Sequence, residues 1–186
     1  MNNERNRVCP VEYAGSLDNK IRKWFQNPKK ILVPYIKKGM IVLDVGCGPG
    51  FFSVEIAKMV GNSGKVFSVD LQEGMLLKLR SKIEGTPLEG IIKLIKCEAD
   101  EINVPEKVDF VLAFYMVHEV SDKNRFFEIM KNNLNEKGRI LIVEPKFFHV
   151  SKQEFNLTTE KAEKIGFKSA QGPNLLFSFS SILNIV

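Results

Sequence analysis

The chain has 186 residues, of which 44% are hydrophobic and 26% are charged, and these values are ordinary for a single soluble globular domain. Its net charge of +5 is modest. The densest basic cluster, Lys20–Lys38, is spread over two expected helices, so a nucleic-acid partner is not expected. No apolar run approaches the ~20 residues of a membrane span, and the polar N-terminus is unlike a secretory signal. Three cysteines without a CxxC pair or a zinc-type cluster indicate no metal site and a cytoplasmic protein.

Residues 1–38 are expected to form an N-terminal helical lid within a single domain of residues 1–186. Asn27 followed by Pro28 predicts the start of a helix in this segment, because proline suits the first helical position. The helical pattern continues past Pro34, which should kink the helix or shift its start.

A buried strand followed by a glycine-rich turn comes next. The apolar run Met40–Leu43 is typical of a strand that is buried on both faces of a parallel sheet. Asp44 follows, and before the helical pattern Ser53–Val60 three glycines occupy alternate positions: Gly46, Gly48 and Gly50. Because glycine has no Cβ, it lets the backbone approach a ligand closely. Strand, glycine turn and helix together predict a nucleotide-type pocket at the carboxyl end of a parallel strand.

The details of this turn restrict the ligand. A dinucleotide-binding fingerprint would need a glycine at position 51, where the chain has Phe51. Pro49 removes one backbone N–H that a pyrophosphate could use, and Asp44 adds a negative charge beside the turn. The turn therefore favours a ligand with a cationic part over a polyphosphate.

A second buried strand, Lys65–Val69, ends in Asp70, which lies 20 residues after Gly50 (70 − 50 = 20). This distance suits one helix plus one strand in a βαβ unit. A carboxylate at the end of the second strand can accept hydrogen bonds from both hydroxyl groups of a ribose. Asp70 could also cap the helix that follows, and the two roles are compatible.

The remaining elements alternate between strands and helices. Ser121 is expected to cap a helix that Gly138 closes, and Ser151 with Glu154 forms a capping box at the start of another helix. The later strands are expected at Ile91–Cys97, Val108–Phe114, Arg139–Val143, Phe167–Gln171 and Leu175–Ile185. Alternating βα units followed by a closing β pair predict an α/β fold, with a doubly wound, seven-stranded, mostly parallel sheet and an antiparallel hairpin at one edge.

Three titratable residues follow the fourth and fifth strands. His118 and Glu119 come just after the fourth strand, and Glu144 comes directly after the fifth. The carboxyl ends of these strands face the crevice in which open α/β sheets bind ligands, and histidine can take up a proton near neutral pH. The three residues are therefore candidate catalytic groups, and packing at the strand end is an equal alternative for His118.

The stretch Leu43–Gly50 resembles motif I of the class I S-adenosylmethionine-dependent methyltransferases. The nearest group is the small-molecule methyltransferases of the ubiquinone/menaquinone-biosynthesis type, and the resemblance runs from about Gly39 to the C-terminus. It implies a Rossmann-like methyltransferase fold, S-adenosylmethionine as the cofactor and a small-molecule acceptor. It also implies cofactor contacts for Asp44, Gly46, Cys47, Gly48, Gly50, Asp70, Leu71, Asp100 and Ala113.

The resemblance further implies individual roles. Asp44 would help to hold the methionine ammonium through water, Asp70 would bind the ribose, and Leu71 would pack on the adenine. Asp100 is the best match for the acid that binds the adenine amine, and it has two close rivals, Glu98 and Glu101. The residues expected to line the substrate cavity are Tyr13, Trp24 and Tyr115, and packing of the lid is an alternative role for the first two.

Three alternatives stay open beside this interpretation. The first is an NAD(P)-dependent oxidoreductase, against which Phe51 argues. The second is a methyltransferase that acts on RNA or protein, although the Asn/Asp-Pro-Pro-aromatic signature of the N6-amine group is missing at Phe114–Met116. The third is a protein that binds the cofactor and transfers nothing. In a methyltransferase the cofactor carries its own leaving group, so little acid–base machinery is needed, and His118 would deprotonate or orient the acceptor.

Overall fold

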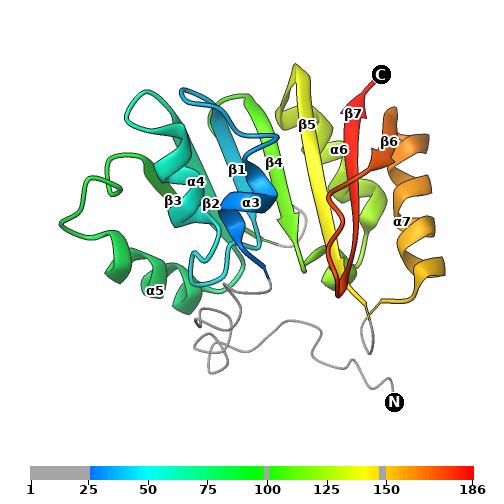
Figure 1. The fold of residues 1–186 in the computed structure, drawn as a ribbon, viewed down its shortest axis with the longest axis horizontal. Helices are drawn as coiled ribbons and strands as arrows, with labels where there is room; N and C mark the ends of the chain where they lie inside the picture. Colours follow the sequence, from blue (N-terminus) through cyan, green and yellow to red (C-terminus); the bar gives the residue numbers. More distant parts are fainter. Residues whose placement is uncertain (1–25, 99–100, 147–149) are drawn as a thin grey trace.

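The computed structural model describes residues 26–98, 101–146 and 150–186. The strands are β1 (Ile41–Val45), β2 (Lys65–Asp70), β3 (Ile92–Lys96), β4 (Val108–Phe114), β5 (Leu134–Pro145), β6 (Phe167–Gln171) and β7 (Ser178–Ile185). They form one seven-stranded sheet in the order β3-β2-β1-β4-β5-β7-β6. The pairs from β3 to β5 are parallel, whereas β7 is antiparallel to both β5 and β6. The expected α/β fold with an antiparallel edge hairpin is thus confirmed (Figure 1).

Helices cover both faces of the sheet. They are α3 (Pro28–Leu32), α4 (Ser53–Val60), α5 (Glu73–Ile83), α6 (Lys123–Asn133) and α7 (Lys152–Lys164), together with a short 3-10 turn, η2 (Val117–Glu119). One core lies under α3, α4 and α5 and contains Leu32, Ile56 and Leu79. The other lies under α6 and α7 and contains Phe127 and Ala162. Successive side chains of a strand point to opposite faces, so β1 and β4 supply both cores, and this explains their continuous apolar sequences.

Two helix starts agree with the sequence and one does not. The Asn27 side chain accepts a hydrogen bond from the Lys30 N–H, and the capping box at Ser151 is complete. The N-cap of α6, however, is Asp122 rather than the expected Ser121, because the Asp122 carboxylate accepts the Arg125 N–H. Aspartate is as good an N-cap as serine, and its position one residue later decides where the helix begins.

Two helix ends also differ from expectation. The helix that starts at Pro28 stops at Leu32 rather than continuing with a kink, because Pro34 has no N–H with which to extend the hydrogen-bond ladder. Gly138 does not close α6, which already ends at Asn133; Gly138 lies inside β5. A Cβ at Gly138 would come within 2.6 Å of the Leu134 side chain, so glycine is needed there for close packing.

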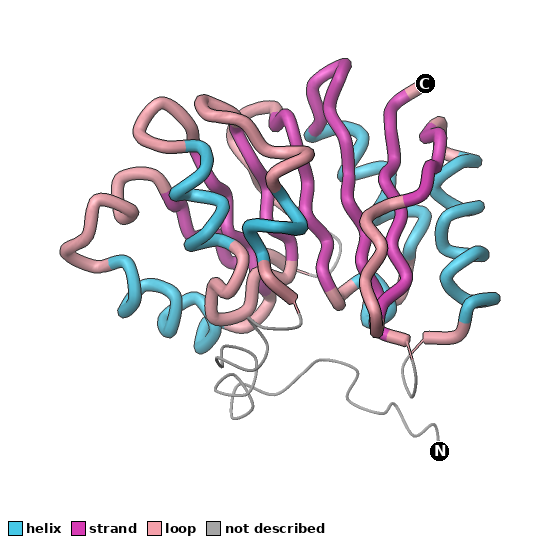
Figure 2. The backbone as a smooth tube through the Cα atoms, in the orientation of Figure 1, coloured by secondary structure: helices cyan, strands magenta, loops and turns pink. Residues whose placement is uncertain are grey.

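The crevice of the sheet lies between β1 and β4. These strands are neighbours, but the chain continues from β1 towards β2 on one side and from β4 towards β5 on the other. The loops that follow β1, β2 and β4 gather at the carboxyl ends of these strands, at the bottom of the view in Figures 1 and 2. In open α/β sheets a switch point of this kind is where ligands bind.

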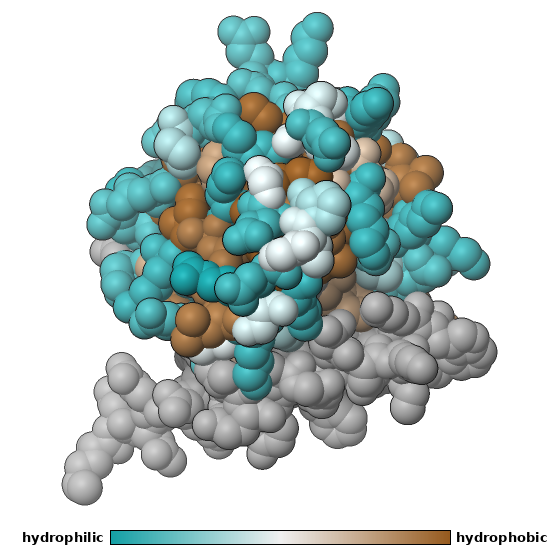
Figure 3. Space-filling view, turned by 90° about the vertical axis from the view of Figure 1, so that its left-hand side faces the viewer, coloured by the Kyte–Doolittle hydropathy of each residue, from teal (hydrophilic) through white to brown (hydrophobic). Residues whose placement is uncertain are grey.

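The outer surface near β3 and α5 is mostly hydrophilic, as the space-filling view from that side shows (Figure 3). Hydrophobic residues form smaller patches there among the charged and polar ones. Within the described ranges, no helix has both the length and the apolar character that crossing a membrane requires.

Candidate active site

The turn after β1 is fastened to the end of β2. The backbone N–H groups of Gly46 and Cys47 both donate to the Val69 carbonyl, at 2.8 and 3.0 Å. The Gly50 N–H then donates to the Cys47 carbonyl at 3.1 Å, which closes the turn. Most of the N–H groups of this turn are thus satisfied within the protein, so the loop forms a fixed wall and not an open anion-binding nest.

The three alternating glycines serve two different purposes. All have positive φ: 66° at Gly46, 53° at Gly48 and 84° at Gly50. A Cβ at Gly46 would lie 2.9 Å from the Met116 side chain, and one at Gly50 would lie 2.2 Å from the Leu79 side chain. A Cβ at Gly48 would meet no atom within 4 Å. The first and third glycines therefore permit internal packing, whereas Gly48 keeps open the space beside the turn.

Asp70 binds the glycine turn through its carboxylate. One oxygen accepts the Gly48 N–H at 2.8 Å and the other accepts the Gln72 N–H at 2.9 Å. Burial raises the pKa of Asp70 above its ordinary value, and these two backbone hydrogen bonds act in the opposite direction. The N-cap residue of α5 is Gln72, so Asp70 precedes the cap position. A carboxylate offers about four acceptor sites, so Asp70 can hold the turn and still accept hydroxyl groups.

Asp44 is tied to the helix that follows the turn. Its side chain is 2% exposed, and Oδ2 accepts a hydrogen bond from the Ser53 hydroxyl at 2.5 Å. Ser53 is the first residue of α4, so this bond fixes the helix against the end of β1. Asp44 nevertheless lines the cavity beside the turn, which leaves its carboxylate available to a cationic group through water.

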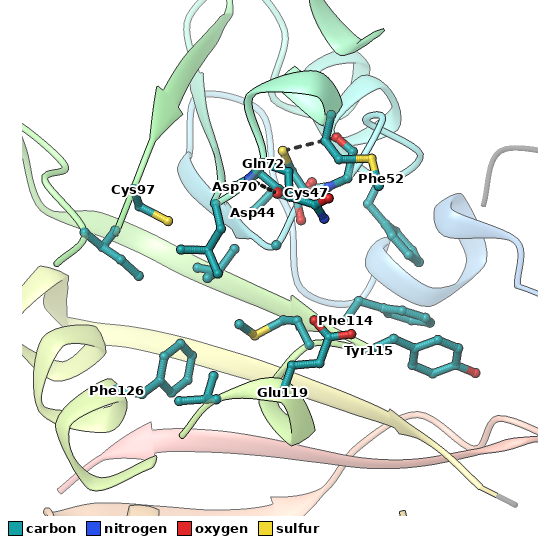
Figure 4. Close-up of a pocket in the computed structure, with 18 of the residues that line it drawn as sticks. Asp44, Cys47, Phe52, Asp70, Gln72, Cys97, Phe114, Tyr115, Glu119 and Phe126 are labelled. Carbon is teal, nitrogen blue, oxygen red and sulfur yellow. Dashed lines mark hydrogen bonds between the residues drawn. The ribbon is translucent and has the colours of Figure 1, made fainter. Parts of the chain in front are cut away.

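A cavity of about 270 Å³ lies at the crevice, beside the glycine turn. This volume is close to the lower end of the range for small-molecule sites, roughly 300–1,000 Å³. Its lining includes most of the residues expected from the sequence: Asp44, Gly46, Cys47, Gly48, Asp70, Leu71, Tyr115 and Glu119. Figure 4 shows Asp70 and Cys47 on one side of this space and Glu119 approaching it from η2. Residues far apart in sequence are therefore brought to one pocket.

Other expected site residues lie elsewhere. Within the described chain, the cavity lining does not include Gly50, Ala113, His118 or Glu144. Ala113 is fully buried in the core under α6 and α7, and Gly50 packs on Leu79. Tyr13, Trp24 and Asp100 lie outside the described residues. Of the two rivals of Asp100, Glu98 lines the cavity and Glu101 does not.

Three aromatic residues form one end of the cavity, and of these only Tyr115 was assigned to the site from the sequence. Phe52, Phe114 and Tyr115 contact one another in series as tilted ring pairs, with ring centroids 4.3 Å and 4.6 Å apart. In Figure 4 they lie at the opposite end of the cavity from Cys97. A signal for Phe52 was present, because it lies two residues after the last glycine of the turn, but an aromatic residue there is equally typical of a core position.

Behind Glu119 lies a histidine that is held by a buried acid. The Glu144 side chain is 2% exposed; one oxygen accepts the Val117 N–H at 2.8 Å and the other pairs with His118 Nδ1. Burial by itself lowers the pKa of His118, but the hydrogen bond and charge of Glu144, with the charge of Glu119, raise it overall. The other ring nitrogen lies 4.0 Å from Glu119 Oε1. Protonated His118 therefore has a carboxylate on each side, and only Glu119 reaches the cavity.

The two cysteines of the cavity wall are not activated thiols. Burial, with the charges of Asp44 and Asp70, raises the pKa of Cys47 well above its ordinary value. Burial and the charge of Asp70 raise the pKa of Cys97 to about 11. Nucleophilic cysteines need a lowered pKa, so both side chains serve as neutral parts of the wall.

These residues fit an adenosyl sulfonium cofactor. The space beside Gly48 would be occupied by any Cβ there, and Asp70 stands next to it as an acceptor for ribose hydroxyls. Leu71 follows Asp70 on the cavity wall and is 41% exposed, so it can cover a flat apolar base. Asp44 places a carboxyl group on the cavity wall, which is the kind of group that the cationic end of such a cofactor requires.

Comparisons with known proteins identify the family of this chain. The family model of the methyltransferase domain matches residues 36–174. The ubiquinone/menaquinone biosynthesis C-methyltransferase UbiE of Marinomonas sp. is 26% identical over 134 residues, which are 72% of this chain and 51% of that protein. The UbiE protein of Psychromonas ingrahamii is 29% identical over 110 residues, or 59% and 44% of the two chains. The chain thus spans about half the length of the curated relatives it matches.

Solved structures show the same similarity over more of the chain. A SAM-dependent methyltransferase from Aquifex aeolicus superimposes with a TM-score of 0.86 and 28% identity, covering 96% of this chain and 100% of the other. A TehB-like SAM-dependent methyltransferase from Corynebacterium glutamicum has a TM-score of 0.71 and 14% identity, covering 95% and 100%, and shows the fold alone. On the family model, the fold and the geometry of the glycine turn, the chain belongs to the methyltransferase domain family, among the class I S-adenosylmethionine-dependent methyltransferases.

Proposed function

We propose that this domain transfers a methyl group from S-adenosylmethionine to a small-molecule acceptor. The observation that carries the proposal is the contact between Asp70 and the Gly48 N–H at the edge of the cavity, at the switch between β1 and β4. The Asp70 carboxylate, which can accept hydrogen bonds from ribose hydroxyl groups, thus lies beside Gly48, the one glycine of the turn that has open space around it. When bound, the cofactor supplies a methyl group on a sulfonium that is its own leaving group.

The chain's own residues have separate tasks on the cofactor side. Asp70 accepts the ribose hydroxyls, and its two backbone hydrogen bonds keep the carboxylate in place for them. Leu71 covers the base, and Asp44 balances the ammonium group. Cys47 and Gly48 form the wall along which the cofactor lies. Rate enhancement then comes mainly from holding the reacting groups in line, which can supply several kcal/mol without acid–base chemistry.

Glu119 is the titratable group that we assign to the acceptor. It lines the cavity, whereas His118 and Glu144 stand behind it. A carboxylate in this position can accept a hydrogen bond from a hydroxyl group of the acceptor and orient it. Because His118 does not line the cavity and its Nδ1 pairs with Glu144, we assign it to the support of Glu119, which lies 4.0 Å from its other ring nitrogen, and not to proton removal from the acceptor.

The nature of the acceptor is suggested by the relatives and by the cavity. The UbiE proteins are named as C-methyltransferases of ubiquinone and menaquinone biosynthesis, and the cavity here is small and has an aromatic end. A ring-shaped small molecule with a hydroxyl group would suit the aromatic wall and Glu119 together. We therefore propose a quinol or a related phenolic ring as the acceptor.

The proposal is tested with S-adenosylmethionine that carries a tritiated methyl group. The protein is incubated with 1,4-naphthoquinol, simple phenols, total RNA and a protein extract, and label is counted in each fraction. We expect label in the quinol or phenol fraction and a loss of most of it in the Glu119→Gln variant. Label in RNA, with binding that weakens steeply as salt rises, would instead support the RNA alternative. Calorimetry with NADH in place of S-adenosylhomocysteine tests the oxidoreductase alternative.

A further inference from the structure

Tyr115 has an unusual backbone conformation. Among the described residues it is the one non-glycine residue with a positive φ, at 60°. A bulky residue in the left-handed region is a strained outlier, and it persists only where the surroundings determine it. Tyr115 directly follows β4 and lines the cavity at the switch between β1 and β4. The strain is therefore located where the wall of the pocket turns away from the sheet.

Both ends of Tyr115 are held. Its backbone N–H donates to the Val143 carbonyl at 2.7 Å. Its hydroxyl lies 2.6 Å from the Ser178 Oγ and accepts a hydrogen bond from the Gln26 amide at 2.6 Å. The ring stands against Phe114, with centroids 4.6 Å apart. These contacts come from three segments that are distant in sequence, and together they fix the direction of the ring.

Neither hydroxyl partner is itself among the cavity-lining residues. Ser178 is the first residue of β7, is 5% exposed and pairs with Pro145 at the end of β5. Gln26 lies next to Asn27, the residue that caps α3. Figure 4 shows the Tyr115 hydroxyl pointing away from Asp70 and Cys47, while its ring closes the aromatic end of the cavity. The phenol therefore serves as an anchor, and the ring is the surface presented to a ligand.

We propose that Ser178 and Gln26 are positioning residues that hold the Tyr115 ring as the acceptor-side wall of the pocket. This inference rests on the proposed function for its meaning in catalysis. The hydrogen-bond chain from Gln26 through Tyr115 to Ser178 balances the strain at Tyr115 and joins the segment before α3 to the edge hairpin. Its loss lets the ring move, which weakens acceptor binding and leaves the cofactor side, built on β1 and β2, unchanged.

The variants are Ser178→Ala, Gln26→Ala and Tyr115→Phe, with Ser180→Ala as the matched control. Ser180 lies on the same strand, and its hydroxyl donates to the Pro173 carbonyl at 2.6 Å, away from Tyr115. The chain has three tyrosines, so labelling with tyrosine that carries ¹³C at the ζ carbon gives a simple spectrum. Tyr115→Phe identifies the Tyr115 signal by removing it. Calorimetry gives the Kd of S-adenosylhomocysteine, and tritium transfer gives KM and kcat for 1,4-naphthoquinol.

Ser178→Ala and Gln26→Ala are each expected to shift the Tyr115 signal, to raise the acceptor KM roughly three- to tenfold, and to leave the Kd and kcat within about twofold. Tyr115→Phe and Ser178→Ala break the same contact, so the double variant should raise KM no further than the larger single effect. An unmoved Tyr115 signal in Ser178→Ala overturns the inference, as does an unchanged KM or an equal loss of cofactor affinity. Failure of the proposed function looks different: the wild-type protein then transfers no label to the quinol or phenol, and the Tyr115 signal alone still decides whether Ser178 and Gln26 hold the ring.

Discussion

Replacing Glu144 by glutamine separates the charge of this buried acid from its shape. Glu144 now accepts the Val117 N–H at 2.8 Å and pairs with His118 Nδ1. Glutamine can keep both contacts only if its carbonyl takes the Val117 N–H and its amide donates to an unprotonated Nδ1. The substitution therefore favours neutral imidazole, and we expect the pKa of His118 to fall. Burial lowers this pKa in the wild type, and in the variant the charge of Glu144 no longer counteracts it.

The raised pKa of His118 also decides at which pH the substitution changes the free energy of unfolding most. The folded-state pKa of His118 is raised above the unfolded value of 6.5. The stability that this histidine contributes is therefore fully present below the unfolded pKa and is lost as the pH rises through the folded pKa. A hydrogen bond to a charged group is worth about 1.5–3 kcal/mol and a neutral one about 0.5–1.5 kcal/mol. Glu144→Gln should thus lower the free energy of unfolding by about 1–2 kcal/mol at pH 6 and by less at pH 9.

Two measurements check this prediction. The chain has two histidines, so an NMR titration of the Cε1–H signals gives the pKa of His118 directly, and urea unfolding at the two pH values gives the stability difference. Glu119→Gln is the matched control. Its Oε1 lies 4.0 Å from the ring and both side chains are 22% exposed, so the fall in the pKa of His118 should be smaller. If Glu144→Gln leaves the pKa of His118 unchanged, or both variants lower it equally, the reasoning is wrong.

Three further predictions concern the glycine turn and a helix end. Asp70→Asn should weaken binding of S-adenosylhomocysteine at least tenfold by calorimetry, because charge-assisted hydrogen bonds are lost; equal affinity would contradict the ribose assignment. Gly50→Ala forces a Cβ to 2.2 Å from the Leu79 side chain and should lower the free energy of unfolding by about 1–3 kcal/mol, measured in urea. Gly48→Ala places its Cβ in open space, so it should affect cofactor affinity more than stability. Ser151→Ala removes the hydrogen bond to the Glu154 N–H and should cost about 1 kcal/mol, read as a lower Tm; an unchanged Tm would mean that the capping box does not stabilise α7.

The sequence predicted best what depends on local pattern. The strand and helix of the first βα unit, the spacing to Asp70 and the capping box at Ser151 each follow from a few neighbouring residues, and the structure places them as expected. The errors concerned helix boundaries, at positions where either of two adjacent residues could act as the cap. Ser121 and Asp122 are both good caps, and only the geometry of the first turn of α6 selects Asp122. The glycine at position 138 has a packing role within β5 that no local pattern reveals.

The acceptor side could not be worked out in the same way. His118 and Glu119 are adjacent in sequence, but only Glu119 lines the cavity, because Glu144 of the neighbouring strand holds the histidine ring behind it. The direction of the Tyr115 ring likewise depends on residues that lie 89 and 63 positions away in sequence. Long-range side-chain contacts of this kind have no signature in periodicity or composition.

Two carboxylates, one in the last residue of β2 and one in the last but one of β5, explain why the crevice has a defined shape. Asp70 binds the Gly48 N–H in the turn after β1, and Glu144 binds the Val117 N–H in the turn after β4. The turn after β1 is thus fixed by an acid of β2, and the turn after β4 by an acid of β5. In the sheet, β2 and β5 lie on opposite sides of the switch point between β1 and β4. The two acids have different roles because Asp70 lines the cavity and Glu144 does not. Asp70 lines the cavity and can both hold the turn and bind a ligand, whereas Glu144 lies behind His118 and acts only by support. A pocket held in this way from both sides keeps its form before a ligand arrives, which lowers the entropy cost of aligning two reactants.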